Sequence, residues 1–170
     1  MRLVPFGREH FHALAGWFGS ERDVVQWGGT GTCFPLDDEQ LSAMLRLGEL
    51  APPERRCWMA ADAGDLVGHA QLAYDWRNGS ARIGRVVIAP AFRGRGLAKP
   101  MLRLVMAEAF AIPAIERLEL YAIAYNAPAI RIYESLGFVH EGEARAAILI
   151  GNERFGNLTM SMLRSEYRPG

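Results

Sequence analysis

The sequence predicts a mixed α/β sandwich, in which helices pack on a central sheet. Apolar patterns along the chain give the order strand, two helices, three strands, helix, strand, helix and two strands. Glycine-containing turns at residues 62–65 and 77–80 join three consecutive strands as hairpins. The length of 170 residues suits one domain spanning residues 1–170.

Seven segments have the apolar pattern or the turn boundaries of strands. They are residues 3–6, 57–61, 66–74, 81–88, 116–123, 145–150 and 155–163. Four segments have helical apolar spacing or a helix-capping residue at the start. The first is residues 10–18, and the second is capped by Asp37 or Asp38 and runs to about Leu50. The third is residues 97–112, with Pro100 in the first turn, and the fourth is residues 127–136, which Gly137 ends. Residues 28–32 predict a flexible loop within the least regular stretch, 21–38.

The turn between the strand 81–88 and the helix 97–112 predicts an anion site. Gly94 and Gly96 allow the backbone to turn sharply and to approach a ligand closely. The first helical N–H groups lack intrahelical acceptors, and they lie at the positive end of the helix dipole. Arg93, Arg95 and Lys99 add three cations. An ordinary surface turn is the alternative, because the turn completes neither a Walker motif nor a dinucleotide fingerprint.

A second segment supplies Asn126, then Tyr133 seven residues later, and Leu-Gly-Phe ending at Phe138. With Arg93-Gly94-Arg95-Gly96-Leu97-Ala98, it resembles the two signatures of the GNAT superfamily of acyl-CoA-dependent N-acetyltransferases. The resemblance implies a mostly antiparallel central sheet whose fourth and fifth strands splay apart. The C-terminal residues 142–162 are similar to the subgroup of ribosomal-protein N-terminal and polyamine acetyltransferases.

The resemblance implies acetyl-CoA as cosubstrate and direct transfer of its acetyl group to a primary amine, either a peptide α-amino group or a small-molecule amine. The pyrophosphate is expected on the glycine turn, and the pantetheine arm between the splayed strands. Asn126 is implied to bind the pantetheine amides, although an Asn before a helix also serves as an N-cap. The implied cofactor-binding residues are Val86, Val87, Ile88, Arg93, Gly94, Arg95, Gly96, Leu97, Ala98, Lys99 and Asn126.

Tyr133 is the implied general acid, and packing on its helix is the alternative. Tyrosine has a pKa of about 10 and a thiol one of about 8.5, so a hydrogen bond to the leaving thiolate is as plausible as full proton transfer. No general base is expected at the usual position, because residues 81–85 contain no carboxylate where related enzymes often carry Glu. His69 and Glu119 are the candidates elsewhere, acting directly or through water.

The acceptor is expected to meet the irregular stretch 21–38. Trp27 and Phe34 are candidate pocket walls, with His69 as a third acceptor residue, although a loop that merely covers the core is an equal alternative. Arg82 and Arg85 attract an acidic acceptor or are simply solvated. A site without a strong base favours an amine of low pKa.

Composition excludes several other classes of protein. Half of the residues are hydrophobic and the formal net charge is zero, which argues against disorder and against nucleic-acid binding. Cys33 and Cys57 lack the spacing of a disulfide framework or a zinc site, so no metal is expected. The chain starts without a signal-like apolar stretch and contains no segment that could span a bilayer, which predicts a cytoplasmic protein without membrane partners. A monomer or a homodimer is expected. An acyl-CoA-binding regulatory module without catalysis is the alternative function.

Overall fold

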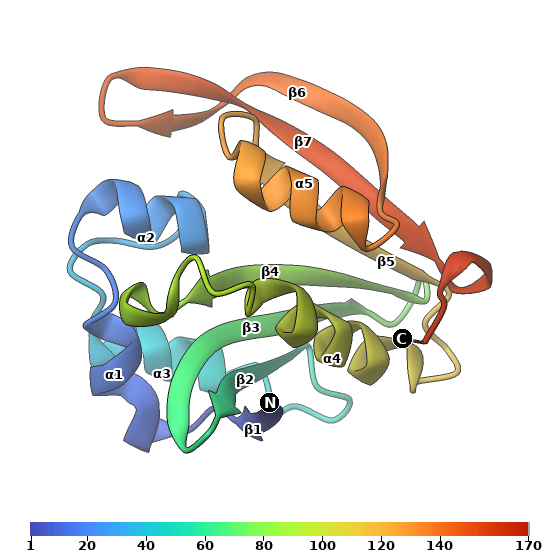
Figure 1. Ribbon diagram of the computed structural model, residues 1–170, viewed down its shortest axis with the longest axis horizontal. Coiled ribbons are helices and arrows are strands. Elements are labelled where there is room, and N and C mark those ends of the chain that lie inside the picture. Colours follow the sequence, from blue (N-terminus) through green and yellow to red (C-terminus); the bar gives the residue numbers. More distant parts are fainter. Residues whose placement is uncertain (170) are drawn as a thin grey trace.

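The computed structural model describes residues 1–169, which form a seven-stranded sheet with helices on both faces (Figure 1). The strands are β1 (Arg2–Pro5), β2 (Arg55–Asp62), β3 (Asp65–Asp75), β4 (Ser80–Ile88), β5 (Arg117–Ile123), β6 (Val139–Ile150) and β7 (Glu153–Leu163). They lie in the order β1-β2-β3-β4-β5-β7-β6. Every neighbouring pair is antiparallel except β4 and β5, which are parallel. The predicted fold class is confirmed.

Two helices cover one face of the sheet and three cover the other. The helices are α1 (Phe11–Ala15), α2 (Glu21–Gly28), α3 (Asp38–Arg46), α4 (Ala98–Phe110) and α5 (Ala127–Ser135), with 3-10 turns at Arg8–His10, Pro90–Phe92 and Arg164–Glu166. The side chains of α4 and α5 join the main core, whereas those of α1, α2 and α3 form a second cluster. None of the helices formed by residues 1–169 has the length and apolar character needed to cross a bilayer.

The structure corrects three expectations about the N-terminal half. A helix, α2, occupies part of the stretch that was expected to be least regular. Ser20 caps it by accepting a hydrogen bond from Asp23 N–H at 3.2 Å, and Trp27 is buried against the core. The helix expected at residues 10–18 ends at Ala15. The helix capped by Asp37 ends at Arg46, short of the expected Leu50.

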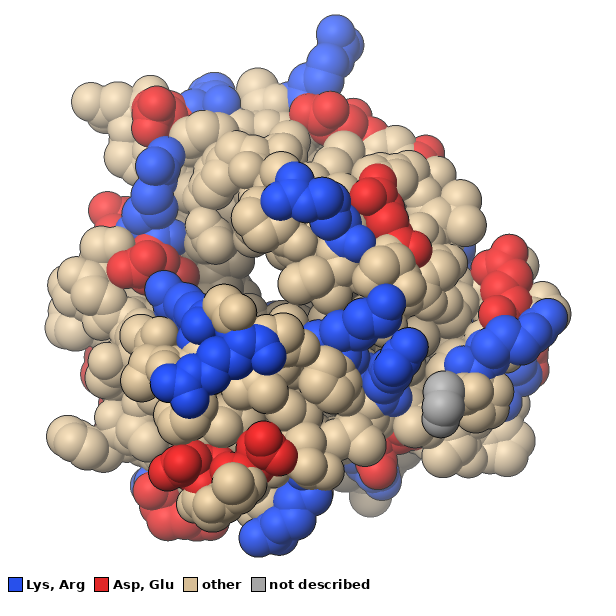
Figure 2. All heavy atoms as spheres, viewed as in Figure 1, with Lys and Arg blue, Asp and Glu red and all other residues tan. Residues whose placement is uncertain are grey.

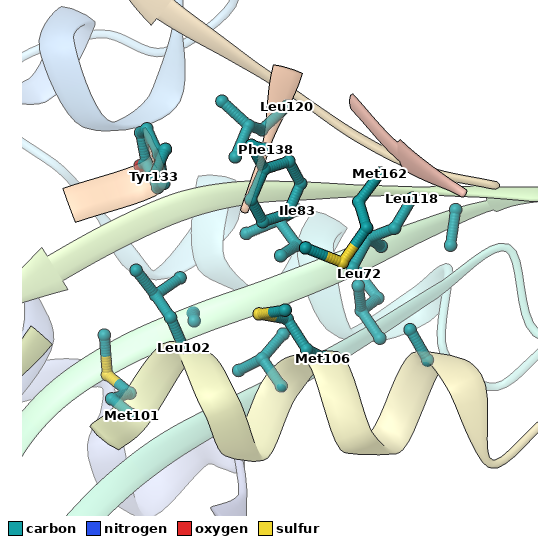
Figure 3. Packing of buried hydrophobic residues seen from close by; sticks show 14 of the residues in the cluster. Leu72, Ile83, Met101, Leu102, Met106, Leu118, Leu120, Tyr133, Phe138 and Met162 are labelled. Atoms are coloured by element: carbon teal, nitrogen blue, oxygen red, sulfur yellow. The ribbon is translucent and has the colours of Figure 1, made fainter. Parts of the chain in front are cut away.

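The main core lies between the sheet and helix α4. Met101, Leu102 and Met106 of α4 point towards Leu72 and Ile83 of the sheet (Figure 3). Gly68 of β3 permits this close packing, because a Cβ atom there would lie 2.7 Å from Sδ of Met101. Tyr133 of α5 lies at one end of this core.

We expect Leu118→Ala to destabilise the protein by roughly 2–5 kcal/mol, because the residue is fully buried and its truncation leaves a cavity. Leu149→Ala is the matched control, since Leu149 is 47% exposed on β6 and should cost less than about 1 kcal/mol. Urea unfolding of both variants measures the difference. Equal losses would contradict the assigned core.

The parallel pair β4 and β5 separates part of the way along the sheet. The two strands are in register only from Ser80 opposite Arg117 to Ile83 opposite Leu120. Beyond that point β4 continues to Ile88 and β5 to Ile123 without pairing with each other. The predicted gap between these strands is therefore confirmed, and it leaves one edge of β4 open.

Candidate active site

A β-bulge lies in β4 beside the gap. His69 is opposite Val87 and Gln71 is opposite Gly84, so that Arg85 and Val86 together face Ala70. Arg85 adopts a positive φ of 50°. Its carbonyl accepts hydrogen bonds from Nε1 of Trp27 at 2.6 Å and from Nδ1 of His69 at 2.9 Å. Two side chains from other elements therefore fix the orientation of this peptide.

That orientation determines where the neighbouring backbone groups point. The carbonyl and the N–H of one peptide point in opposite directions, so the Val86 N–H faces away from Trp27 and His69. Ala89 N–H donates to the carbonyl of Val67 in β3. The N–H and C=O groups of successive residues in a strand point to alternate edges, so those of Ile88 point towards the gap. There the Ile88 carbonyl accepts a hydrogen bond from Nε of Arg93 at 3.2 Å.

A cavity of about 700 Å³ passes through the gap between the strands. Leu102 of α4 and Tyr133 of α5 line it from one face of the sheet, and Trp27 of α2 and Gln71 of β3 line it from the other. Figure 2 shows an opening in the molecule that is bordered in this view by uncharged and basic side chains. A cavity that reaches both faces lets two ligands meet at the open edge of β4.

The glycine turn before α4 has the geometry that an anion requires. Gly94 and Gly96 have φ angles of 75° and 73°, and a Cβ atom at either position would meet nothing within 4 Å. Leu97 precedes α4 without a side-chain cap, which leaves the first N–H groups of the helix available. Among the expected turn residues, Arg93 and Ala98 line the cavity itself.

The cations of this turn are held by backbone oxygens. Arg95 donates to the carbonyl of Ala91 at 3.0 Å, and Lys99 donates to the carbonyl of Ser135 at 3.1 Å. The ion pairs that arginines form within residues 1–169 involve Arg22, Arg117 and Arg164 instead. The positive charges of the turn are therefore not neutralised by carboxylates.

Tyr133 and Asn126 both line the cavity: Tyr133 lies within α5, and Asn126 precedes the first residue of that helix. Burial raises the pKa of Tyr133 to about 12, so its hydroxyl stays protonated throughout the neutral range. Its ring packs edge-on against Phe138 with the centroids 6.2 Å apart. Asn126 is the N-cap of α5, because its Oδ1 accepts from Ala129 N–H at 3.3 Å. The side-chain N–H groups of this cavity-lining residue donate no hydrogen bond within residues 1–169.

Of the three residues expected to contact the acceptor, only one lines the cavity. Trp27 lines the cavity, but Phe34 lies outside it, 45% exposed beside a smaller hollow. His69 is fully buried and does not line the cavity. Burial lowers the pKa of His69 to about 4, which keeps the ring neutral. His69 therefore supports the Arg85 carbonyl and does not face an acceptor.

Neither expected candidate for the general base reaches the cavity. His69 is sealed in the core, and its Nε2 has no hydrogen-bond partner within residues 1–169. Glu119 of β5 pairs with Arg117 at 3.4 Å and is not a lining residue. Among residues 1–169, Asp23 is the one acidic residue that lines the cavity. Its Oδ2 accepts a hydrogen bond from Ser20 Oγ at 2.8 Å, at the start of α2.

Several lining residues were missed by the sequence interpretation. Arg55, Gln71 and Tyr121 come from three different strands and reach the cavity from the same face of the sheet. Strand alternation places them on this face, but only the register between strands brings them together. No local motif marks them.

Comparison with known proteins supports the signatures in the sequence. A family model described as "Acetyltransferase (GNAT) family" matches residues 23–138. A prophage-derived uncharacterized N-acetyltransferase of Bacillus subtilis is 31% identical over 93 residues, which cover 55% of this chain and 52% of that protein. The spermidine N(1)-acetyltransferase of Vibrio cholerae is 27% identical over 115 residues, which cover 67% of this chain and 66% of that protein. The matched segment thus spans about half to two thirds of these relatives.

Solved structures extend the similarity to nearly the whole chain. The structure of spermidine N-acetyltransferase from Vibrio cholerae in complex with CoA and spermine superposes with a TM-score of 0.83 at 21% identity. The match covers 98% of this chain and 96% of that one, and it shows the shared fold. The predicted likeness to polyamine acetyltransferases is confirmed at the level of relatives. Because the family model covers well over half of its residues, the chain belongs to the GNAT family of acetyltransferases.

Proposed function

We propose that the protein transfers the acetyl group of acetyl-CoA directly to a primary amine. The observation that carries this proposal is the cavity that passes through the gap between β4 and β5, lined by Tyr133 from one face of the sheet and by Trp27 from the other. Family membership supports the same reaction. The chain acts in this proposal as a single catalytic domain.

The residues present fit coenzyme A. Gly94 and Gly96 present no Cβ atom to an approaching anion, the first N–H groups of α4 are uncapped, and Arg93, Arg95 and Lys99 supply three cations without carboxylate partners among residues 1–169. The open edge of β4 at Val86 and Ile88 offers backbone hydrogen bonds to the amides of the pantetheine arm, and Asn126 offers its side-chain amide. When bound, acetyl-CoA supplies an activated thioester.

The chain's own residues then have separate roles in the transfer. The N–H of Val86, held by the anchored Arg85 peptide, donates to the thioester oxygen as negative charge develops there. The amine nitrogen forms a bond to the carbonyl carbon, and the C–S bond breaks. Tyr133 donates a hydrogen bond to the departing thiolate. A thiol has a pKa of about 8.5, so a hydroxyl with a pKa of about 12 donates this bond more readily than it gives up its proton.

The acceptor in this proposal is a peptide α-amino group or a small-molecule amine of low pKa. Within residues 1–169 the lining offers no carboxylate base other than the capping Asp23, so the amine loses its proton to water. An α-amino group with a pKa of about 7.7–8.0 is roughly a tenth to a sixth neutral at pH 7, whereas a lysine side chain with a pKa of about 10.4 is neutral only about 0.04% of the time. This difference favours the α-amino group by more than about a hundredfold.

A panel of amines tests both the reaction and this preference. Release of the CoA thiol is followed at pH 7 with α-amino peptides, an α-blocked lysine, spermidine and an aminoglycoside, and mass spectrometry locates the acetyl group. We expect the α-amino peptides to have the highest kcat/KM. Higher values for lysine or spermidine would refute the preference but not the reaction. Tight CoA binding without turnover on any amine would instead support the regulatory module.

A further inference from the structure

We infer that the acceptor amine belongs to a molecule that also bears a carboxylate, which the guanidinium groups of Arg55, Arg82 and Arg85 bind in the cavity. This inference rests on the proposed function, because it names the substrate class of the same site. The shared chemistry is an α-amino group with a carboxylate a few bonds away, as in an acidic amino acid or a peptide with an acidic first residue.

The three arginines lie together because of strand register. Arg55 of β2 pairs with Ala73 of β3, and Ala73 pairs with Arg82 of β4, so that both side chains leave the same face of the sheet. Arg85 follows in the bulge of β4. All three line the cavity on the face that carries α2, away from the glycine turn.

Aromatic rings hold two of these guanidinium groups in place. The Cζ atom of Arg82 lies 5.0 Å from the centroid of the Tyr121 ring, and that of Arg85 lies 5.2 Å from the centroid of the Trp27 ring. Both rings also line the cavity. Stacking of this kind orients the planar donors without using their N–H groups, which stay available for a ligand.

The positive charge of this cluster is not balanced by the surrounding protein. Neither Arg55, Arg82 nor Arg85 takes part in the ion pairs formed within residues 1–169. The Nε of Arg55 is buried without a hydrogen-bond partner. Burial, together with the nearby charge of Arg55, lowers the pKa of Arg85 to about 10. The pKa of Arg55 is likewise lowered, first by burial.

The acidic side chains near the cluster are otherwise engaged or turned outward. Glu119 is opposite Arg82 in the register, but its Oε2 pairs with Arg117. Asp23 accepts hydrogen bonds at the start of α2. Glu54 precedes Arg55 and is exposed. Arg55 and Arg85 are half-buried like charges, and Arg82 adds an exposed one beside them. Half-buried like charges are costly, so the site is complete only when an anion enters it.

A carboxylate suits this site better than a cation or a phosphate. Its two oxygens match the fork of a guanidinium group, and several arginines can share them. In the proposed function the phosphates of the cosubstrate bind at the glycine turn, which leaves the arginine cluster for the acceptor. A polyamine would bring its remaining ammonium groups close to three guanidinium groups, which Coulomb repulsion disfavours.

The test compares acceptors that differ only in the anion. The peptides Asp-Ala-amide and Asn-Ala-amide have nearly the same shape and similar α-amino groups, so their kcat/KM ratio isolates the carboxylate. We expect the Asp peptide to be favoured by about tenfold or more, mainly through KM, because the Asn peptide lacks the charge that the guanidinium groups bind. Free aspartate, its α-amide and spermidine form the second set, which distinguishes a free amino acid from a peptide.

Variants assign the preference to the cluster. Arg55→Gln and Arg82→Gln should each reduce the Asp-to-Asn ratio by about tenfold, with CoA affinity in calorimetry retained as evidence of folding. Arg56→Gln is the matched control, because Arg56 is the next residue of β2, is exposed and does not line the cavity. It should leave the ratio unchanged.

The outcomes separate this inference from the proposed function. Turnover with equal efficiency on both peptides, best turnover on spermidine, or an unchanged ratio in both cavity variants would overturn the carboxylate site while leaving acetyl transfer intact. Absence of turnover on every amine in the presence of bound CoA would overturn the proposed function itself.

Discussion

Tyr133→Phe is expected to lower kcat by about a hundredfold or more while leaving the affinity for CoA nearly unchanged. Tyr133 lines the cavity, and burial raises the pKa of its hydroxyl to about 12, so the hydroxyl stays a hydrogen-bond donor at every working pH. Its contribution arises only as charge develops on the leaving sulfur, which places the loss in kcat. The phenyl ring retains the packing against Phe138, so folding is preserved.

Steady-state kinetics and calorimetry on the same preparation check this prediction. Tyr125→Phe removes a hydroxyl outside the cavity lining, one that donates to Gln26 at 3.0 Å, and it should keep turnover within about twofold. If Tyr133→Phe retained the turnover of the unaltered protein, Tyr133 would be a packing residue and its role as hydrogen-bond donor to the leaving sulfur would be wrong.

Gly96→Val has the second largest expected effect, a loss of CoA affinity of about tenfold or more. Gly96 has a φ of 73°, a conformation that costs a β-branched residue roughly 1–2 kcal/mol, so the turn is expected to change shape. A changed turn no longer aims its N–H groups at one point, and the added side chain occupies the open space that a pyrophosphate would approach. Calorimetric titration with CoA measures the loss.

Gly64→Val is the matched control for this change. Gly64 also has a positive φ, of 97°, and open space around it, but it lies in the turn between β2 and β3 and does not line the cavity. The control should lower the melting temperature by a similar amount without weakening CoA binding. Full affinity in the folded Gly96→Val protein would remove the turn from the cofactor site.

The sequence predicted the elements whose signals are local. The strands around the turn at residues 62–65, the helix cap at Asp37 and the helix after Asn126 all follow from turn and capping chemistry. The separation of β4 and β5 was also predicted, through the family resemblance and Pro90. Helix α2 was missed because the glycines after it suggested a loop, although Ser20 and Asp23 supply a capping signal at its start.

The features that were not predicted depend on contacts between distant residues. The positive φ of Arg85 is held by Trp27 and His69 from other elements, so no pattern around residue 85 could reveal it. His69 was a candidate base because its position in a strand does not reveal that the side chain is fully buried. Arg55 joins the cavity only through the register of three strands, which sequence patterns leave open.

A structure of the complex with coenzyme A tests the central claim most directly. The account predicts the pantetheine arm between β4 and β5, the pyrophosphate on the N–H groups at Gly94, Gly96 and Ala98, and the sulfur within hydrogen-bond distance of the Tyr133 hydroxyl. Coenzyme A bound elsewhere, or bound in the gap with its sulfur remote from Tyr133, would contradict it.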